Sequence, residues 1–213
     1  KNQSEHGVIN LDLVWGTSTL TVFEESELAH SAVLPIGSKH ITNDLAIALR
    51  TSVDIAERIK LEYCCTSDAE DMRKKENIDL SKLIDEENFV VAKKQLIRVV
   101  DARVHELLDM VNNELKKSNK STIFPAGVVI SGGGANLTGL AMLVKEKLRL
   151  PVRIAQPIGL AESVSDPSYA VAVGLVLWGF DQEFNNLKSK PSQFMAGDNG
   201  FKKIIDWLKN FLP

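Results

Sequence analysis

Residues 127–140 read GVVISGGGANLTGL and place an apolar run, three consecutive glycines and the beginning of an amphipathic pattern side by side. The run 127–131 is typical of a buried strand, and the spacing after the glycines predicts a helix from about Leu137 to Leu148. Glycines between a strand and a helix leave backbone N–H groups open to a phosphate or a nucleoside. They also occur where a chain only needs a tight corner, and the triplet alone does not separate these readings.

Composition narrows the class of protein. The 213 residues are 44% apolar and 25% charged, with a net charge of −3, which is ordinary for a soluble globular protein and gives no basic field for nucleic acid. Adjacent Cys64 and Cys65 would pair only in a strained ring, so we expect a reducing compartment. No apolar stretch reaches the ~20 residues of a membrane span. The scattered histidines predict no metal site, and we assign no catalytic residue.

The rest of the chain alternates strand and helix patterns. Three strands are expected within 8–34, with a hairpin turn at Glu24–Ser26, because short apolar runs alternate there with turn residues. Residues 66–88 are charge-rich and predict a loop with short structure inside it. A strand is expected at 152–155, and helices are expected at 41–49, 52–65, 92–118 and from Pro167 onwards.

The C-terminal segment has the pattern of an interfacial helix. A polar stretch from Phe180 to Gly200 predicts a linker, and GFKKIIDWLKNFLP at 200–213 separates bulky apolar residues from lysines on a helical wheel. Such a helix lies in a membrane interface, and each of three lysines adds about 1 kcal/mol of attraction to anionic lipid. The alternative is a terminal helix docked on the domain. The predicted membrane-binding residues are Phe201, Lys202, Lys203, Ile204, Ile205, Trp207, Leu208, Lys209, Phe211 and Leu212.

The order of these elements resembles the FtsA family of bacterial cell-division proteins, within the actin-like ATPase superfamily. Residues 127–157 resemble its adenosine-binding motif with the helix and strand that follow, and DPSYAVAVGLVLWG at 166–179 resembles its closing helix. Residues 34–63, which contain ITND and AERIK, and residues 99–115, which read VVDARVHELLDMVNNEL, resemble its outer subdomain. The resemblance covers nearly all of residues 7–213.

The resemblance implies an α/β fold in which two ribonuclease-H-like domains enclose a nucleotide cleft. We expect this chain to be a fragment or truncated product that holds the second, C-terminal half only, with an inserted helical and strand subdomain and a C-terminal amphipathic helix. The expected parts are a core subdomain at 1–37 and 125–180, an outer, FtsZ-binding subdomain at 38–124, a flexible linker at 181–199 and a membrane-targeting helix at 200–213.

The resemblance also implies a set of binding residues. With ATP and Mg²⁺ as the cofactor, the nucleotide-binding residues would be Asp12, Gly16, Thr17, Ser18, Glu57, Lys60, Gly132, Gly133 and Gly134. Arg103 and Glu106 match the positions with which the family holds the C-terminal tail of FtsZ. From the residues alone, Glu57 with Lys60 reads as an ordinary surface ion pair, and Arg103 with Glu106 as a solvated helix face.

The second phosphate loop departs from the family pattern, which is rich in glycine. Here residues 12–19 read DLVWGTST, so that Val14 and Trp15 stand where glycines let backbone N–H groups meet phosphate. We expect their side chains to obstruct the phosphate and to disfavour any positive φ that the loop requires. Normal phosphate binding is therefore in doubt, and hydrolysis more so.

The sequence therefore favours a membrane-anchoring adaptor of the division ring that binds FtsZ and anionic inner-membrane lipid, with ATP as a structural or polymerisation ligand. It would be a peripheral protein on the cytoplasmic face of the cell membrane at the division site, and copies would self-associate into actin-like filaments. One alternative is an actin-like enzyme that hydrolyses ATP, of the chaperone or sugar-kinase type. The other is a pilus-type actin-like assembly protein, which needs no lipid-binding tail.

Overall fold

The computed structural model describes residues 7–67, 77–84, 88–118, 124–157 and 164–189. The chain divides into two compact units, Lys1–Val171 and Ala172–Pro213. The predicted amphipathic helix at 200–213 lies outside the described residues, as do residues 190–199, so the membrane-binding residues stay a prediction.

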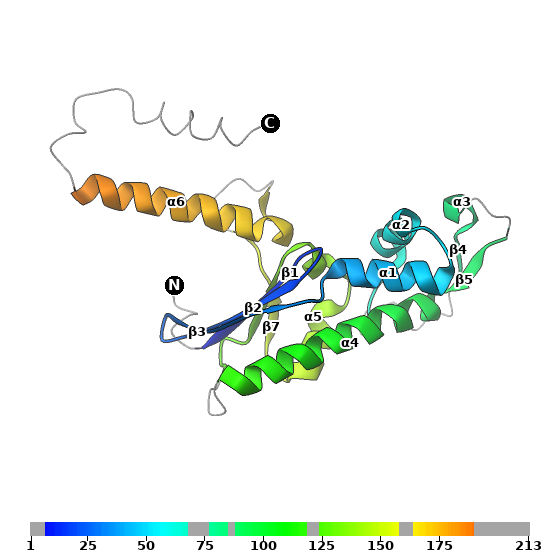
Figure 1. The fold of residues 1–213 in the computed structure, drawn as a ribbon, viewed down its shortest axis with the longest axis horizontal. Helices are drawn as coiled ribbons and strands as arrows, with labels where there is room; N and C mark the ends of the chain where they lie inside the picture. Colours follow the sequence, from blue (N-terminus) through cyan, green and yellow to red (C-terminus); the bar gives the residue numbers. More distant parts are fainter. Residues whose placement is uncertain (1–6, 68–76, 85–87, 119–123, 158–163, 190–213) are drawn as a thin grey trace, which may run out of the picture. The chain divides into compact units, whose positions relative to one another are not determined.

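A five-stranded sheet forms the centre of the first unit, in the order β3-β2-β1-β6-β7 (Figure 1). β1, β2 and β3 form an antiparallel meander. β6 pairs with β1 in parallel, and β7 pairs with β6 in parallel. All five strands were expected from the sequence. Their bounds are β1 (Val8–Leu13), β2 (Ser18–Glu24), β3 (Glu27–Leu34), β6 (Val128–Ser131) and β7 (Val152–Ile154).

The turn between β2 and β3 is where the sequence predicted it. Glu25 and Ser26 both have positive φ, at 48° and 67°. Two consecutive left-handed residues make the turn whose twist suits a two-residue hairpin, so the local backbone matches the strands it joins.

The helices also follow the predicted pattern, and the long helix α4 lies beside the sheet (Figure 1). Ser52 caps α2 as expected, because its Oγ accepts a hydrogen bond from the Ile55 N–H at 3.3 Å. The predicted loop at 66–88 contains a short strand and a short helix. The elements are α1 (Ser38–Leu49), α2 (Val53–Tyr63), β4 (Asn77–Asp79), α3 (Ser81–Ile84), β5 (Val90–Ala92), α4 (Lys93–Ser118) and α5 (Leu140–Leu148).

The glycine triplet leads into a 3₁₀ turn before α5 begins. This turn, η3 (Gly133–Asn136), is followed by Gly139 at φ 85°, and α5 starts at Leu140 instead of near Leu137. The start is later because residues 133–139 form separate tight turns, and the left-handed glycine precedes the first helical residue.

One hydrophobic core runs beneath both predicted subdomains. The periodic face of α4, including Leu96, Val100, Val104 and Leu108, is buried in the same cluster as strand residues such as Leu11. Each Å² of apolar surface buried contributes about 25 cal/mol, so burial of this face stabilises the helix far more than intrinsic helix propensity does. The proposed boundaries at 37/38 and 124/125 fall in loops, but the core continues across them.

Polar contacts also tie α4 to the edge strand β3 and to helix α5. Glu114 Oε2 lies 3.3 Å from His30 Nε2 on β3, and Asp109 Oδ1 lies 2.7 Å from Lys147 Nζ on α5. The single long helix therefore spans from the outer elements to the sheet edge.

The last helix extends further than the sequence predicted. After the short turn η5 (Pro167–Tyr169), α6 (Ala170–Ser189) continues into the range 181–199 that was expected to be a linker. The polar composition suggested a loop, yet no glycine or proline occurs between Gly179 and Pro191, so nothing stops the helix locally. The predicted linker therefore does not begin at residue 181. No helix of the described residues has the length and apolar content to cross a membrane.

Candidate nucleotide cleft and partner groove

The carboxyl ends of β1 and β6 bring Asp12 together with the glycine turn. Asp12 pairs with Ser131 across the parallel strands, and the Ser131 hydroxyl donates to Asp12 Oδ1 at 2.7 Å. The Gly132 N–H donates to Pro167 O at 2.9 Å, which fixes the start of the turn. Ligands of open α/β sheets bind at such strand ends, so this edge stays a candidate site, although Asp12 itself is only 9% exposed.

The three glycines have different surroundings. Gly132 has φ 82°, and a Cβ there would lie 2.4 Å from Leu13 O. A Cβ on Gly134 would lie 2.8 Å from Leu13 Cβ, whereas one on Gly133 would meet only Ser168 Cβ at 4.0 Å. Packing against β1 therefore explains Gly132 and Gly134. Packing against β1 does not require a glycine at Gly133, which therefore stays a candidate for close approach by a ligand.

The loop between β1 and β2 is docked on the beginning of α1. The carbonyls of Val14 and Trp15 accept hydrogen bonds from the N–H groups of Ser38 and Lys39 at 3.0 and 2.9 Å. Gly37 makes this possible, because a Cβ there would lie 2.6 Å from the backbone of the loop. Helix α1 thus holds the loop in place.

The loop needs no left-handed residue at Val14 or Trp15. The described non-glycine residues with positive φ do not include either of them, so the expected backbone conflict does not arise. Any obstruction comes from the side chains, which are 36% and 52% exposed.

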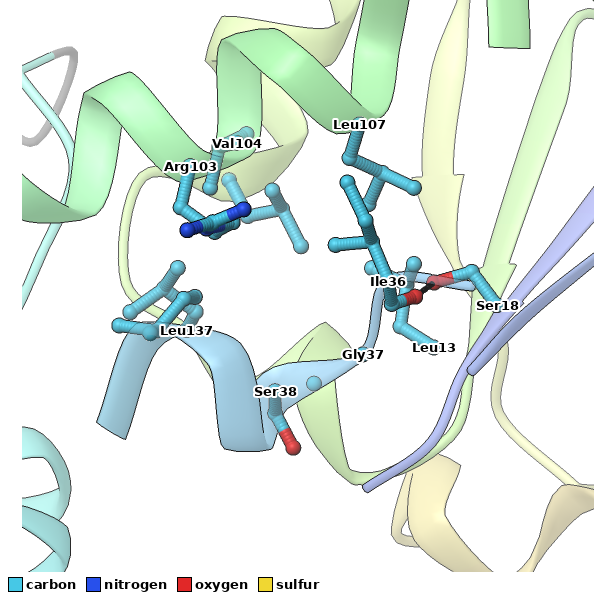
Figure 2. Close-up of a pocket in the computed structure, with 12 residues that line it drawn as sticks. Leu13, Ser18, Ile36, Gly37, Ser38, Arg103, Val104, Leu107 and Leu137 are labelled. Carbon is cyan, nitrogen blue, oxygen red and sulfur yellow. Dashed lines mark hydrogen bonds between the residues drawn. The ribbon is translucent and has the colours of Figure 1, made fainter. Parts of the chain in front are cut away.

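The other predicted loop residues separate into two groups. Ser18 is fully buried, and its Oγ donates to Ile36 O at 2.5 Å (Figure 2), which places its hydroxyl in the core and not at a surface that phosphate reaches. Gly16 and Thr17 are partly exposed. Lys39 Nζ lies 3.6 Å from the position of a Cβ on Gly16 and is a cation that the sequence reasoning missed.

Glu57 and Lys60 belong to a partly buried polar network, not to an open surface pair. Lys60 Nζ donates to Glu57 Oε2 at 2.7 Å and to Thr42 Oγ1 at 3.0 Å, and the Thr42 hydroxyl donates to Glu57 Oε2 at 2.5 Å. The Trp15 ring centroid lies 5.1 Å from Lys60 Nζ. Thr42 and Trp15 were not predicted, because α1, α2 and the loop meet only in the folded chain.

Arg103 and Glu106 lie together on α4, as their spacing predicted. Arg103 is not a free cation, however, because Nε and Nη2 bind Asp44 of α1 at 2.7 and 2.8 Å, while Nη1 binds Glu106 at 2.6 Å. The bidentate contact with Asp44 raises the pKa of the Arg103 guanidinium above its ordinary value.

An open groove of about 450 Å³ lies between α1 and α4. Its apolar side chains come from both helices, and Ile47 is 76% exposed within it. Charged groups of both signs border the apolar surface, so a short segment with both apolar and charged residues would fit. The lining residues are Asp44, Ile47, Ala48, Arg98, Val99, Ala102, Arg103 and Glu106.

A second, small cavity is lined by residues that include Leu13, Ser38 and Arg103 (Figure 2). Its volume of about 30 Å³ and its nearly apolar lining suit neither a nucleotide nor a well-bonded water. Arg103 therefore lines both this cavity and the groove between α1 and α4.

Burial and a raised pKa make the Cys64 thiol unreactive near neutral pH. Both Cys64 and Cys65 are buried and outside any disulfide of the described residues, and burial raises the pKa of the Cys64 thiol to about 12. The thiolate is therefore not populated near neutral pH.

Comparisons with known proteins give the family. The family model described as "Cell division protein FtsA" matches residues 11–174. The chain is 33% identical to Cell division protein FtsA of Pseudomonas aeruginosa, over 100% of this chain and 52% of that protein. It is also 33% identical to the protein of the same description from Neisseria meningitidis serogroup B, over 99% of this chain and 52% of that protein.

Solved structures agree on the fold. The structure of MreB 5 of Spiroplasma citri bound to AMPPNP has a TM-score of 0.71 and 16% identity, over 89% of this chain and 57% of that one. The fold is thus that of the actin-like ATPases, and the chain spans about half the length of the curated relatives it matches. With the family model covering most of its residues, this chain belongs to the FtsA family of cell division proteins.

Proposed function

We propose that this chain is the FtsZ-binding and membrane-anchoring part of an adaptor in the bacterial division ring. The observation that carries the proposal is the α1/α4 groove, in which an exposed apolar surface meets Arg103 and Glu106. By the family resemblance these two residues match the positions that hold the FtsZ tail, and the groove adds the apolar surface that a helix face alone would lack.

Arg103 gives the groove a chemical preference. Three of its N–H groups bind Asp44 and Glu106, and its guanidinium has five in total. A carboxylate on a partner segment would accept from the remaining N–H groups, while apolar partner side chains cover Ile47 and Val99. The preferred partner is therefore a short peptide that carries both an acidic and an apolar residue.

Membrane attachment is assigned to residues 200–213, whose sequence pattern is that of an interfacial helix. A helix of about a dozen residues binds lipid modestly, so assembly of several copies into actin-like filaments would multiply its effect. ATP with Mg²⁺ would serve as a structural or polymerisation ligand at the cleft beside Asp12, Glu57 and Gly133. The protein would act on the cytoplasmic face of the cell membrane, at the place of division.

The test is co-sedimentation of purified FtsZ with liposomes that contain anionic lipid. Four chains are compared: the full chain, the chain ending at Asn199, the full chain with Arg103→Ala and the full chain with Arg58→Ala. Arg58 is exposed on α2 and outside the groove, so its variant controls for the loss of one positive charge.

If the chain is such an adaptor, FtsZ should sediment with the liposomes in the presence of the full chain and of the Arg58→Ala variant. The chain ending at Asn199 should stay in solution, and the Arg103 variant should pellet without FtsZ. If the truncated chain pellets equally well, the membrane assignment is wrong. If Arg103→Ala carries as much FtsZ as the control, the groove is not the partner site.

The enzymatic alternative makes a separate prediction. An ATP-hydrolysing member of the superfamily would release phosphate continuously in a steady-state assay on an intact homologue, whereas a structural ligand would not. The pilus-type alternative predicts that Ile205→Glu together with Leu208→Glu leaves localisation unchanged.

A further inference from the structure

Trp15 belongs to the loop between β1 and β2, beside the residues proposed to bind nucleotide. Its carbonyl accepts from the Lys39 N–H, so the backbone that carries it is anchored. Its indole lies over Lys60 Nζ, at 5.1 Å from the ring centroid, yet the residue remains 52% exposed. The ring is therefore positioned by a cation–π contact and still open to a ligand.

The Lys60 ammonium beside the indole already donates hydrogen bonds to other side chains. Lys60 is 9% exposed and donates to Glu57 and Thr42, so its charge is neutralised inside the network. It acts as a positioning residue that holds the Glu57 carboxylate and the indole close together. It does not offer a free positive charge to phosphate.

Glu57 keeps one carboxylate oxygen for a ligand. Within the described part of the chain, its hydrogen bonds from Thr42 and Lys60 both go to Oε2. Its side chain is 26% exposed, and a carboxylate accepts O–H donors such as sugar hydroxyls but repels phosphate. An indole beside it offers a flat apolar face to a base or to a sugar ring.

We propose that this cleft selects its ligand by the nucleoside part, that Trp15 is the specificity-determining residue, and that phosphate groups add little affinity. The inference rests on the nucleotide role proposed for the cleft and names what the cleft recognises. Lys39, whose Nζ lies 3.6 Å from the position of a Cβ on Gly16, is the cation that would favour phosphate instead.

Equilibrium dialysis of the full chain with adenosine, ADP, MgATP and inorganic triphosphate tests this inference. The variants are Trp15→Phe, Val14→Gly with Trp15→Gly, and Lys39→Ala, and Trp178→Phe is the control because Trp178 is an exposed indole on α6. Circular dichroism checks that each variant is folded.

The proposal predicts that adenosine and MgATP bind the wild-type chain within about threefold of each other and that triphosphate alone does not bind. Trp15→Phe and Trp178→Phe keep this ratio, because both retain an aromatic ring at position 15. The double glycine variant weakens adenosine and shifts the ratio by about tenfold toward MgATP, a difference of about 1.4 kcal/mol.

Two results would overturn the proposal. One is a wild-type preference for MgATP over adenosine of more than about tenfold that Lys39→Ala abolishes, since phosphate would then be read by Lys39. The other is no binding of any of these ligands. Neither result changes the liposome experiment with FtsZ, so failure of this inference and failure of the adaptor function are distinguishable.

Discussion

At the scale of single residues, Gly132 and Gly133 show how neighbours in one triplet differ in what requires them. Gly132 has φ 82° and abuts Leu13 O, so both the backbone conformation and the space exclude a side chain. Gly133 has ordinary contact distances around it. The sequence could place a glycine turn here, but it could not tell which glycine serves the fold and which is open to a ligand.

Alanine at these two positions should therefore have different effects on stability. We expect Gly132→Ala to lower the free energy of unfolding by about 1–3 kcal/mol, from left-handed strain and overlap with Leu13. Gly133→Ala should change it by less than about 0.5 kcal/mol. Urea unfolding followed by circular dichroism measures both, and equal costs would show that the crowding at Gly132 is relieved by a small backbone shift.

At the scale of elements, helix α4 joins the outer elements to the sheet through residues at its C-terminal end. The hydrogen bond from Lys117, and secondarily that from His30 on β3, hold the pKa of Glu114 below its ordinary value of 4.5. A carboxyl whose pKa is lowered by folding adds stability above its unfolded pKa, and that stability is lost as the pH falls through the folded pKa.

Glu114→Gln should therefore lower the urea midpoint at pH 6 and make little difference at a pH below the lowered pKa of the folded protein, where the wild-type carboxyl is also protonated. The effect is small because the contacts are near the surface. Urea titrations of both chains between these pH values check it, with Glu146→Gln on α5 as a control for the loss of one exposed carboxylate. A difference that persists unchanged into the acid range would assign the effect to packing and not to charge.

At the scale of the whole molecule, the main hydrophobic core is made by residues between Ile9 and Ile154. It belongs to the first compact unit, Lys1–Val171. Because cooperative unfolding depends on one continuous core, this unit should keep its own transition without the residues that follow.

A chain ending at Val171 should accordingly unfold in one cooperative step, with a free energy of unfolding within about 1 kcal/mol of the chain ending at Asn199. Circular dichroism in increasing urea makes the comparison, and the longer truncation controls for removal of the tail alone. Loss of the cooperative transition would mean that α6 is required for the core to form.

The sequence by itself determined the kinds of element and their order, because apolar periodicity is a local property that each segment carries alone. It placed the strands, the turn at Glu25 and the long helix correctly, and the motifs in ITND, AERIK and the glycine triplet led to the family. It misjudged the end of α6, where polar composition outweighed the absence of any residue that breaks a helix.

Only the tertiary structure decided which polar side chains meet. Asp44 and Arg103 are 59 positions apart, and no spacing rule connects them, yet both line the groove between α1 and α4. Trp15 reaches Lys60 because α1 holds its loop, and Ser18 turns into the core because β2 alternates its side chains between the two faces. Side-chain contacts across elements depend on how the elements pack, which a local pattern does not contain.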